Sequence, residues 1–220
     1  LDAAAKQVQL ANGQALSYDI LIIATGAKVE PEETEGLTGE GWYKNRFDFY
    51  TLAGAEQLQA ALKNFTGGHL VINIVDMPIK CPVAPLEFAF LADAYFKRRG
   101  LRDKVKISYV TPLDAAFTKP IAAKVFGDFL SHKGVELVPE FNTGRVEGNQ
   151  IISWDERTVD FDLLVTIPLH SGADFVKSSD IGDDLGFVRV NKGTLQSEKY
   201  PEIFALGDAA NVPTSKAGAV

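Results

Sequence analysis

Two short segments near opposite ends of the chain constrain its fold most strongly. Residues 19–27 form an apolar run that leads into Thr25 and Gly26, and residues 203–211 form another that leads into Gly207 and Asp208. Each pattern predicts a buried strand followed by a tight turn. Because open α/β sheets bind ligands where their strands end, both turns are candidate ligand-binding positions.

Composition favours a globular protein and excludes several other classes. The chain has 220 residues, of which 46% are hydrophobic, and this is enough for one substantial core or two smaller ones. Its net charge of −7 argues against a nucleic-acid-binding surface, which needs clustered Lys and Arg. We interpret the one basic stretch, residues 97–104, as a solvated helix end, with a membrane or partner contact as the alternative. No apolar run approaches the roughly 18 residues of a membrane-spanning helix.

Cysteine and histidine positions predict neither a disulfide framework nor a metal site. Cys81 is the only cysteine, and no Cys/His cluster accompanies it. The three histidines, His69, His132 and His170, are scattered, and we interpret each as a surface or structural residue.

The central part of the chain alternates between predicted strands and helices. Helices are predicted at residues 51–62, 84–99 and 120–133. Buried strands are predicted at residues 69–75, 105–110, 135–138 and 163–167. A small β-meander is predicted at residues 143–146, 150–154 and 158–161. This succession is typical of a Rossmann-like α/β domain.

The sequence pattern of the N-terminal part differs from that of the central part. Residues 6–10 and 15–23 are predicted as two strands joined by an Asn12-Gly13 turn, which is a strong hairpin signal. Residues 28–46 have no clear period and predict a surface connection, so we place a domain boundary there.

The central domain lacks the residues with which such a domain usually binds NAD(P). A dinucleotide-binding unit has glycines after its first strand and an acidic residue after its second. Here residues 71–87 contain three prolines and no glycine, and no carboxylate follows the second strand before Asp114. NAD(P) binding is therefore disfavoured.

Cys81 stands where the glycines would be, followed by Pro82, Pro85 and Glu87. A sulfur beside a helix N-terminus lies in a positive potential that favours the thiolate. Glu87, in the first turns of that helix, could carry protons to or from the sulfur or a bound acceptor. Two structural alternatives stay open: Cys81 as a small buried hydrophobe, and Glu87 as a surface acid that complements the helix dipole.

The motif from Cys81 to Glu87, set between the two end segments, resembles sulfide:quinone oxidoreductase and the flavoprotein subunit of flavocytochrome c sulfide dehydrogenase. The end segments resemble the ATG and GD segments of the FAD-dependent pyridine nucleotide-disulfide oxidoreductase superfamily. The resemblance implies FAD-binding-domain pieces at residues 1–46, including the connection, and at residues 173–220. Between them it implies an NAD(P)-binding-like domain at residues 47–172.

The resemblance also implies an activity. In that family electrons pass from sulfide through a cysteine pair and FAD to a quinone, or to a cytochrome in the flavocytochrome branch. Cys81 would be one cysteine of the pair, and Glu87 a nearby acid in proton transfer. The residues implied to contact FAD are Thr25, Gly26, Ala27, Gly207, Asp208 and Lys216. Of these, Asp208 would hydrogen-bond the ribityl or phosphate region, and Lys216 would stabilise negative charge on the reduced flavin.

The sequence departs from the family pattern in three respects. The partner cysteine would lie downstream of Val220, and the additional cysteine that some members carry before the central domain has no match here. No G-x-G-x-x-G unit precedes residue 19. We therefore expect this chain, as an internal piece, neither to hold FAD nor to be active by itself. Family members attach peripherally to membranes through C-terminal segments not present here, and a homo-oligomer is compatible with the resemblance.

Two other functions stay open at this point. One is an NAD(P)H-dependent flavin oxidoreductase like the type II NADH dehydrogenases, and the other is a non-catalytic interaction domain. The sequence leaves the cellular compartment open.

Overall fold

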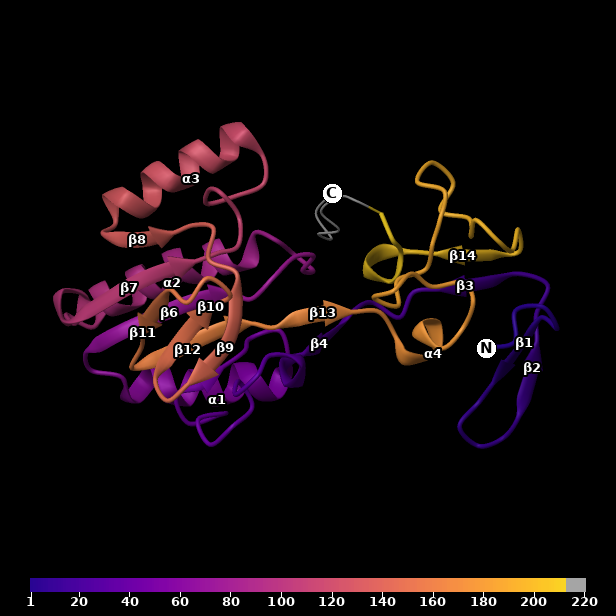
Figure 1. Ribbon diagram of the computed structural model, residues 1–220, viewed down its shortest axis with the longest axis horizontal. Coiled ribbons are helices and arrows are strands. Elements are labelled where there is room, and N and C mark those ends of the chain that lie inside the picture. Colours follow the sequence, from indigo (N-terminus) through magenta and orange to yellow (C-terminus); the bar gives the residue numbers. More distant parts are fainter. Residues whose placement is uncertain (213–220) are drawn as a thin grey trace. The chain divides into compact units, whose positions relative to one another are not determined.

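A five-stranded parallel sheet is the core of the larger part of the chain in the computed structural model, which describes residues 1–212. Its strands lie in the order β5 (Arg46–Phe47), β12 (Leu163–Ile167), β6 (Gly68–Ile74), β7 (Val105–Val110) and β8 (Val135–Val138) (Figure 1). All four neighbouring pairs are parallel. The chain runs outward from β6 to β8 and returns on the other side of β6 as β12. This reversal is that of a doubly wound sheet, and it confirms the predicted Rossmann-like α/β class.

Three helices connect these strands: α1 (Leu52–Asn64), α2 (Ala84–Arg98) and α3 (Pro120–His132). The Thr51 side chain caps α1 by accepting a 3.0 Å hydrogen bond from the Gly54 amide. Gly100 and Gly134 follow α2 and α3 with φ of 65° and 61°, a conformation that ends a helix at little cost for glycine. The predicted helices and their stop signals are confirmed. A short 3-10 turn, η2 (Arg102–Lys104), leads into β7.

Strand β6 is buried on both faces, which explains its unbroken apolar sequence. Leu70, Ile72 and Ile74 belong to a core shared with the three helices, in which Leu86 and Phe96 of α2 are fully buried or nearly so. Val71, on the opposite face of the strand, belongs to a second cluster. Successive side chains of β6 therefore enter two different cores. This fixes the register of β6 with its neighbouring strands, because a slip of one residue would exchange its two faces.

The second cluster lies under the β-meander, formed by β9 (Thr143–Glu147), β10 (Gln150–Ser153) and β11 (Thr158–Asp160). These three strands pair antiparallel and supply apolar residues such as Ile151, which is fully buried. A polar contact crosses the same interface, where Asn73 Nδ2 donates to Thr143 Oγ1 at 2.9 Å. The predicted meander is confirmed.

The chain divides into two units, which we describe separately: residues 30–169, and residues 1–29 with the segment from His170 onward. Strands β4 (Lys28–Glu30) and β13 (Leu169–Ser171), where the chain passes from one unit to the other, pair with each other. Residues 30–46 are part of the surface connection predicted from the sequence, but in the structure they lie in the larger unit. This segment contains the 3-10 turn η1 (Pro31–Glu33). Most of these residues form tight turns, which explains why the segment lacks a period, yet Leu37 within it is fully buried.

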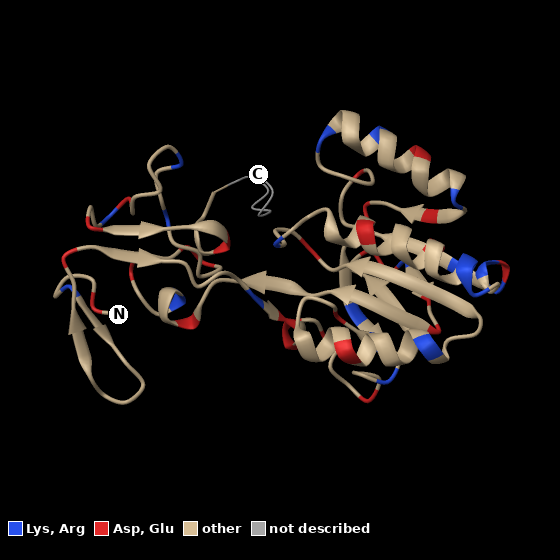
Figure 2. Cartoon of the chain, turned by 180° about the vertical axis from the view of Figure 1, so that it is seen from behind, with Lys and Arg blue, Asp and Glu red and all other residues tan. Residues whose placement is uncertain are grey.

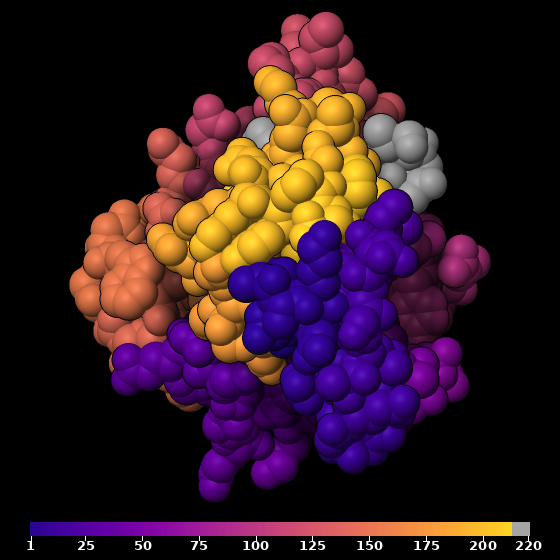
Figure 3. Space-filling model, turned by 90° about the vertical axis from the view of Figure 1, so that its right-hand side faces the viewer, coloured from indigo at the N-terminus to yellow at the C-terminus, as the bar shows by residue number. Residues whose placement is uncertain are grey.

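In the smaller unit, the N-terminal and C-terminal parts of the chain pack on each other, as the indigo and yellow atoms of Figure 3 show. Its elements are a hairpin of β1 (Gln7–Gln9) and β2 (Ala15–Ser17), a parallel pair of β3 (Leu21–Ile23) and β14 (Ile203–Ala205), the short helix α4 (Asp174–Lys177) and the 3-10 turn η3 (Gly207–Ala209). Its core includes Ile23, Val188 and Ile203.

The strand predicted at residues 15–23 is two strands, so that prediction was wrong. Strand β2 pairs with β1, whereas β3 pairs with β14. The change of partner occurs at residues 18–20: the Tyr18 amide still bonds back to Lys6, and the Leu21 amide bonds to Glu202. Within residues 1–212, no helix is long and apolar enough to cross a bilayer.

Candidate functional site

Two turns emerge side by side from neighbouring parallel strands of the smaller unit. Ile203 of β14 lies opposite Leu21 of β3, and Ala205 lies opposite Ile23. The pairing continues for one more bond, in which the Leu206 amide donates to the Ile23 carbonyl at 2.9 Å. The turns that begin at Ala24 and Leu206 therefore lie at the same sheet edge, where α/β folds bind ligands.

Each turn contains a glycine, so its backbone is not covered by a side chain at that position. Gly26 and Gly207 have φ of 69° and 61°, which glycine adopts far more readily than other residues. A Cβ added to either would meet no described atom within 4 Å, so it is the backbone conformation, not crowding within residues 1–212, that requires glycine. Thr25 is exposed and Ala27 is half-buried. A ligand can thus approach the backbone closely at this edge.

Asp208 provides the polar group of this edge. It lies within η3, and its Oδ1 atom is buried without a hydrogen-bond partner among the described residues. A buried acceptor left unpaired is costly, on the order of 1–3 kcal/mol, so the position suits a ligand that donates a hydrogen bond. Lys216, the cation predicted to accompany it, lies outside the described residues.

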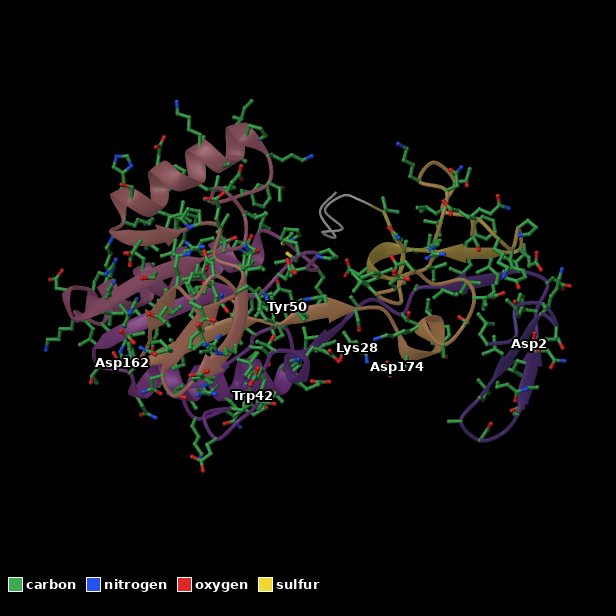
Figure 4. All side chains as sticks on the ribbon, viewed as in Figure 1. Asp2, Lys28, Trp42, Tyr50, Asp162 and Asp174 are labelled. Carbon is green, nitrogen blue, oxygen red and sulfur yellow. The ribbon has the colours of Figure 1, made fainter. Side chains whose placement is uncertain are left out.

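The first turn is also tied to the rest of its unit. Lys28, which follows Ala27, forms a 2.6 Å ion pair with Asp174 at the start of α4, and Figure 4 labels both residues. The Asp174 side chain is 81% exposed, so the pair adds little stability. Its effect is local, because it connects the end of the turn to α4.

A second group of candidate residues lies in the larger unit, where the chain passes from β6 to α2. Cys81 is half-buried, three residues before α2 begins, and it is outside the buried core. Its φ of 49° lies in the left-handed region, which is uncommon for a residue other than glycine. Its carbonyl oxygen accepts two hydrogen bonds, from Tyr50 Oη at 3.2 Å and from the Ala84 amide at 3.0 Å.

The start of α2 offers few amides to a phosphate. The Ala84 amide is bonded to Cys81, Pro85 has no amide hydrogen, and the Glu87 amide donates to the Val83 carbonyl at 3.0 Å. Diphosphates bind helix N-termini through such amides, so this arrangement is unfavourable for a dinucleotide. The Glu87 side chain is exposed in the first turn of the helix, as the sequence indicates.

The structure therefore places the predicted site residues in two groups. Cys81 and Glu87 belong to the larger unit, and the predicted FAD-contacting residues within the described part, Thr25, Gly26, Ala27, Gly207 and Asp208, belong to the smaller unit. Their proposed roles remain predictions.

Sequence reasoning missed two residues beside Cys81. Tyr50 contacts the Cys81 carbonyl from 31 positions earlier in the chain, and no local pattern reveals such a contact. Lys80 directly precedes Cys81, and its Nζ lies 5.6 Å from the centroid of the Tyr50 ring. A cation adjacent to the single cysteine is a signal that the sequence contained.

Two aromatic residues before α1 and one of the three histidines have structural partners. Phe47 is fully buried in the main core, and Phe49 packs against that core. His69 Nε2 lies 2.7 Å from Ser108 Oγ, and Lys106 and burial both lower the pKa of this histidine, burial more strongly. Across residues 1–212, no group of three or more His, Cys, Asp and Glu side chains is placed to hold a metal ion.

Comparisons with known proteins relate nearly the whole chain to oxidoreductases. The chain is 31% identical over 216 residues to the mitochondrial sulfide:quinone oxidoreductase of Mus musculus, covering 94% of this chain and 48% of that protein. It is 26% identical over 223 residues to an NADH dehydrogenase-like protein of Mycobacterium tuberculosis, covering 96% and 53%. No protein-family model matches the chain.

A solved structure shares the fold. The sulfide:quinone oxidoreductase of Aquifex aeolicus matches with a TM-score of 0.80 at 22% identity, covering 97% of this chain and 51% of that one. The chain spans about half the length of the curated relatives it matches. By its similarity to the mouse enzyme and to two further mitochondrial members, the chain is a relative of the sulfide:quinone oxidoreductases.

Proposed function

We propose that this chain is part of an FAD-dependent oxidoreductase that passes electrons from sulfide, through Cys81 and the flavin, to a quinone. The observation that carries the proposal is the position of Cys81: a half-buried sulfur-bearing residue at the entrance of α2, where a dinucleotide-binding domain would have its phosphate-binding glycines. The sequence similarity to sulfide:quinone oxidoreductases supports it.

FAD is the proposed cofactor, and the residues after β3 and β14 fit it. The unpaired Oδ1 of Asp208 can accept a hydrogen bond from a ribityl hydroxyl, and the bare backbone at Gly26 and Gly207 leaves room for close approach. When bound, FAD supplies a two-electron acceptor that a quinone can reoxidise. Lys216 is proposed to stabilise the negative charge that develops on reduction.

Cys81 is proposed to be one sulfur of a disulfide or polysulfide bridge. Hydrosulfide attacks this bridge, a new S–S bond forms to one sulfur, and the other sulfur leaves as a thiolate with the electron pair of the broken bond. For the cycle to close, the leaving thiolate would form an S–S bond to the newly added sulfur and so lose that electron pair. Bound FAD would supply the acceptor for the pair, and the quinone would take up the two electrons with two protons to become the quinol. Lys80, the residue before Cys81, supplies a positive charge that attracts the hydrosulfide anion.

Glu87 is proposed to move protons in this cycle. Its carboxylate is exposed in the first turn of α2, six residues after Cys81, so it can exchange protons with solvent. In this role it would take up the proton that hydrosulfide releases on forming the new S–S bond. A Glu87→Gln variant would then slow flavin reduction by sulfide while FAD stays bound.

A second candidate, an NAD(P)H-dependent flavin oxidoreductase, is favoured by the similarity to an NADH dehydrogenase-like protein. The occupied amides at the start of α2 count against it. A third candidate, an interaction domain without catalysis, predicts that Cys81 can be replaced without any effect on activity.

The proposal is tested with the full-length protein, loaded with FAD and mixed anaerobically with sulfide or with NADH. Bleaching of the flavin by sulfide but not by NADH supports it, and the reverse supports the second candidate. In the Cys81→Ser variant, reduction by sulfide should fall more than about 10³-fold while FAD stays bound. Unchanged reduction in that variant overturns the role of Cys81. Reoxidation by a soluble quinone, compared with a c-type cytochrome, then identifies the acceptor.

A further inference from the structure

Resting on the proposed function, we infer that Tyr50 is a positioning residue for Cys81. Its hydroxyl holds the main chain of Cys81, and its ring holds the Lys80 cation beside that residue. Tyr50 is on the turn between β5 and α1, and Figure 4 labels it.

Tyr50 sits on a rigid turn. Asp48, which is 1% exposed, accepts hydrogen bonds from the Thr51 amide at 2.7 Å and from Thr51 Oγ1 at 3.0 Å. The same Thr51 hydroxyl caps α1. Gly54 makes room for the carboxylate, since a Cβ there would lie 2.2 Å from Asp48 Oδ2. Residues 48–51 are therefore fixed to the start of α1.

The same turn is fixed to the start of α2. The Phe49 ring stacks on the Phe88 ring, with centroids 5.1 Å apart and planes 12° from parallel. The Tyr50 ring lies 5.0 Å from the Phe49 ring. Phe88 directly follows Glu87, so Tyr50 keeps a set position relative to the first turn of α2.

From this position the hydroxyl anchors a strained residue. The Cys81 carbonyl accepts one hydrogen bond from Tyr50 and one from Ala84, which uses both lone pairs of the oxygen. The left-handed conformation of Cys81 costs about 1–2 kcal/mol and persists only where surrounding contacts hold it. Without the Tyr50 hydroxyl, Cys81 can relax and its sulfur can turn away from the reactive position.

The ring has a separate effect. Lys80 Nζ lies 5.6 Å from the ring centroid, within the range of a cation–π interaction. Lys80 is the residue before Cys81, so holding its ammonium on the ring keeps a positive charge near the cysteine. Such a charge attracts anionic sulfur species.

Two variants separate these effects in the full-length FAD-loaded protein. Tyr50→Phe removes the hydroxyl and keeps the ring, whereas Tyr50→Leu removes both. Tyr95→Phe is the matched control, because Tyr95 Oη also donates to a backbone carbonyl, that of Leu62 at 3.4 Å. The first measurement is flavin reduction at saturating sulfide, together with the KM for quinone. The second is alkylation of the reduced Cys81 thiol by iodoacetate and by iodoacetamide, followed on its peptide by mass spectrometry.

We expect Tyr50→Phe to slow flavin reduction by about 10- to 100-fold with an unchanged KM for quinone, and Tyr95→Phe to have no such effect. The ratio of iodoacetate to iodoacetamide rates reports local positive charge. It should fall at least about twofold in Tyr50→Leu and stay unchanged in Tyr50→Phe, a pattern that simple loosening of the loop does not produce.

Reduction at the wild-type rate in Tyr50→Phe, or an equal change of the ratio in both Tyr50 variants, overturns the inference. Failure of the proposed function gives a different result. In that case the Cys81→Ser variant keeps full sulfide-dependent flavin reduction, and both proposals are wrong.

Discussion

Arg102 Nε donates a 2.8 Å hydrogen bond to Asp93 Oδ1, and the Asp93 side chain is only 1% exposed. Lys97 and Lys133 lie 3.0 and 3.1 Å from its other oxygen. The carboxylate therefore joins α2, η2 and the end of α3. Figure 2 shows basic residues at this end of α2. The stretch interpreted from sequence as a solvated helix end thus has a further role, since Lys97 and Arg102 neutralise a buried acid.

Replacing Asp93 by Asn should destabilise the protein strongly. The variant keeps the shape of the side chain but leaves Arg102 and two lysines facing one another without a counter-ion. Removing one partner of a buried ion pair costs about 3–5 kcal/mol. Urea denaturation of the full-length protein measures the change. Asp103→Asn, at an exposed position in η2, is the control and should change the free energy of unfolding by less than about 0.5 kcal/mol. Equal effects of both variants would contradict this account.

The same cluster predicts a loss of stability in acid. Burial raises the pKa of Asp93, but hydrogen bonds from Arg102, Lys97 and Lys133 outweigh it, and the net pKa lies below the ordinary value of 3.8. A carboxylate with a lowered pKa in the folded state stabilises the protein above its unfolded pKa. This stabilisation is lost as the pH falls through the folded pKa. The melting temperature of the wild type should therefore fall more steeply below about pH 4 than that of Asp93→Asn. Parallel curves for the two proteins would exclude Asp93 as the source.

Local patterns predict the central domain well and the long-range contacts poorly. The run of apolar residues in β6 and the cap at Thr51 are local signals, and both are confirmed. Leu37 is buried within irregular turns, and a segment without hydrophobic periodicity gives no indication of which residues are buried. For the site, the turns at Gly26 and Gly207 follow from residue type alone. The contact of Tyr50 with Cys81 depends on tertiary packing of the turn before α1 against α2, which no local spacing encodes.

We expect Arg46 to be a second charged residue on which the stability of the larger unit depends. It is 7% exposed, and its guanidinium donates to the carbonyls of Gly36, at 2.5 Å, and of Gly148. Arg46→Ala leaves these acceptors without their donor and opens a cavity, at an expected cost of about 2–4 kcal/mol in urea denaturation. Arg98→Ala, at an exposed position of α2, serves as control and should cost less than about 0.5 kcal/mol. A small effect at Arg46 would mean that water replaces its hydrogen bonds.

The turn after β3 allows cofactor binding to be separated from stability. Gly26 and Gly13 lie in the same unit, both have positive φ, at 69° and 86°, and a Cβ on either meets no described atom within 4 Å. Alanine at either position should therefore cost a similar amount of stability, about 1–2 kcal/mol, because only the backbone conformation is strained.

Gly26, however, is at the sheet edge beside Asp208, whereas Gly13 is in the hairpin between β1 and β2. If FAD approaches the bare backbone of Gly26, the added methyl group excludes it there alone. Gly26→Ala in the full-length protein should lose at least about tenfold in FAD affinity, measured by the flavin retained after dialysis, and Gly13→Ala should retain it. Equal retention in both variants would place the flavin away from this turn and would leave the unpaired oxygen of Asp208 to another ligand.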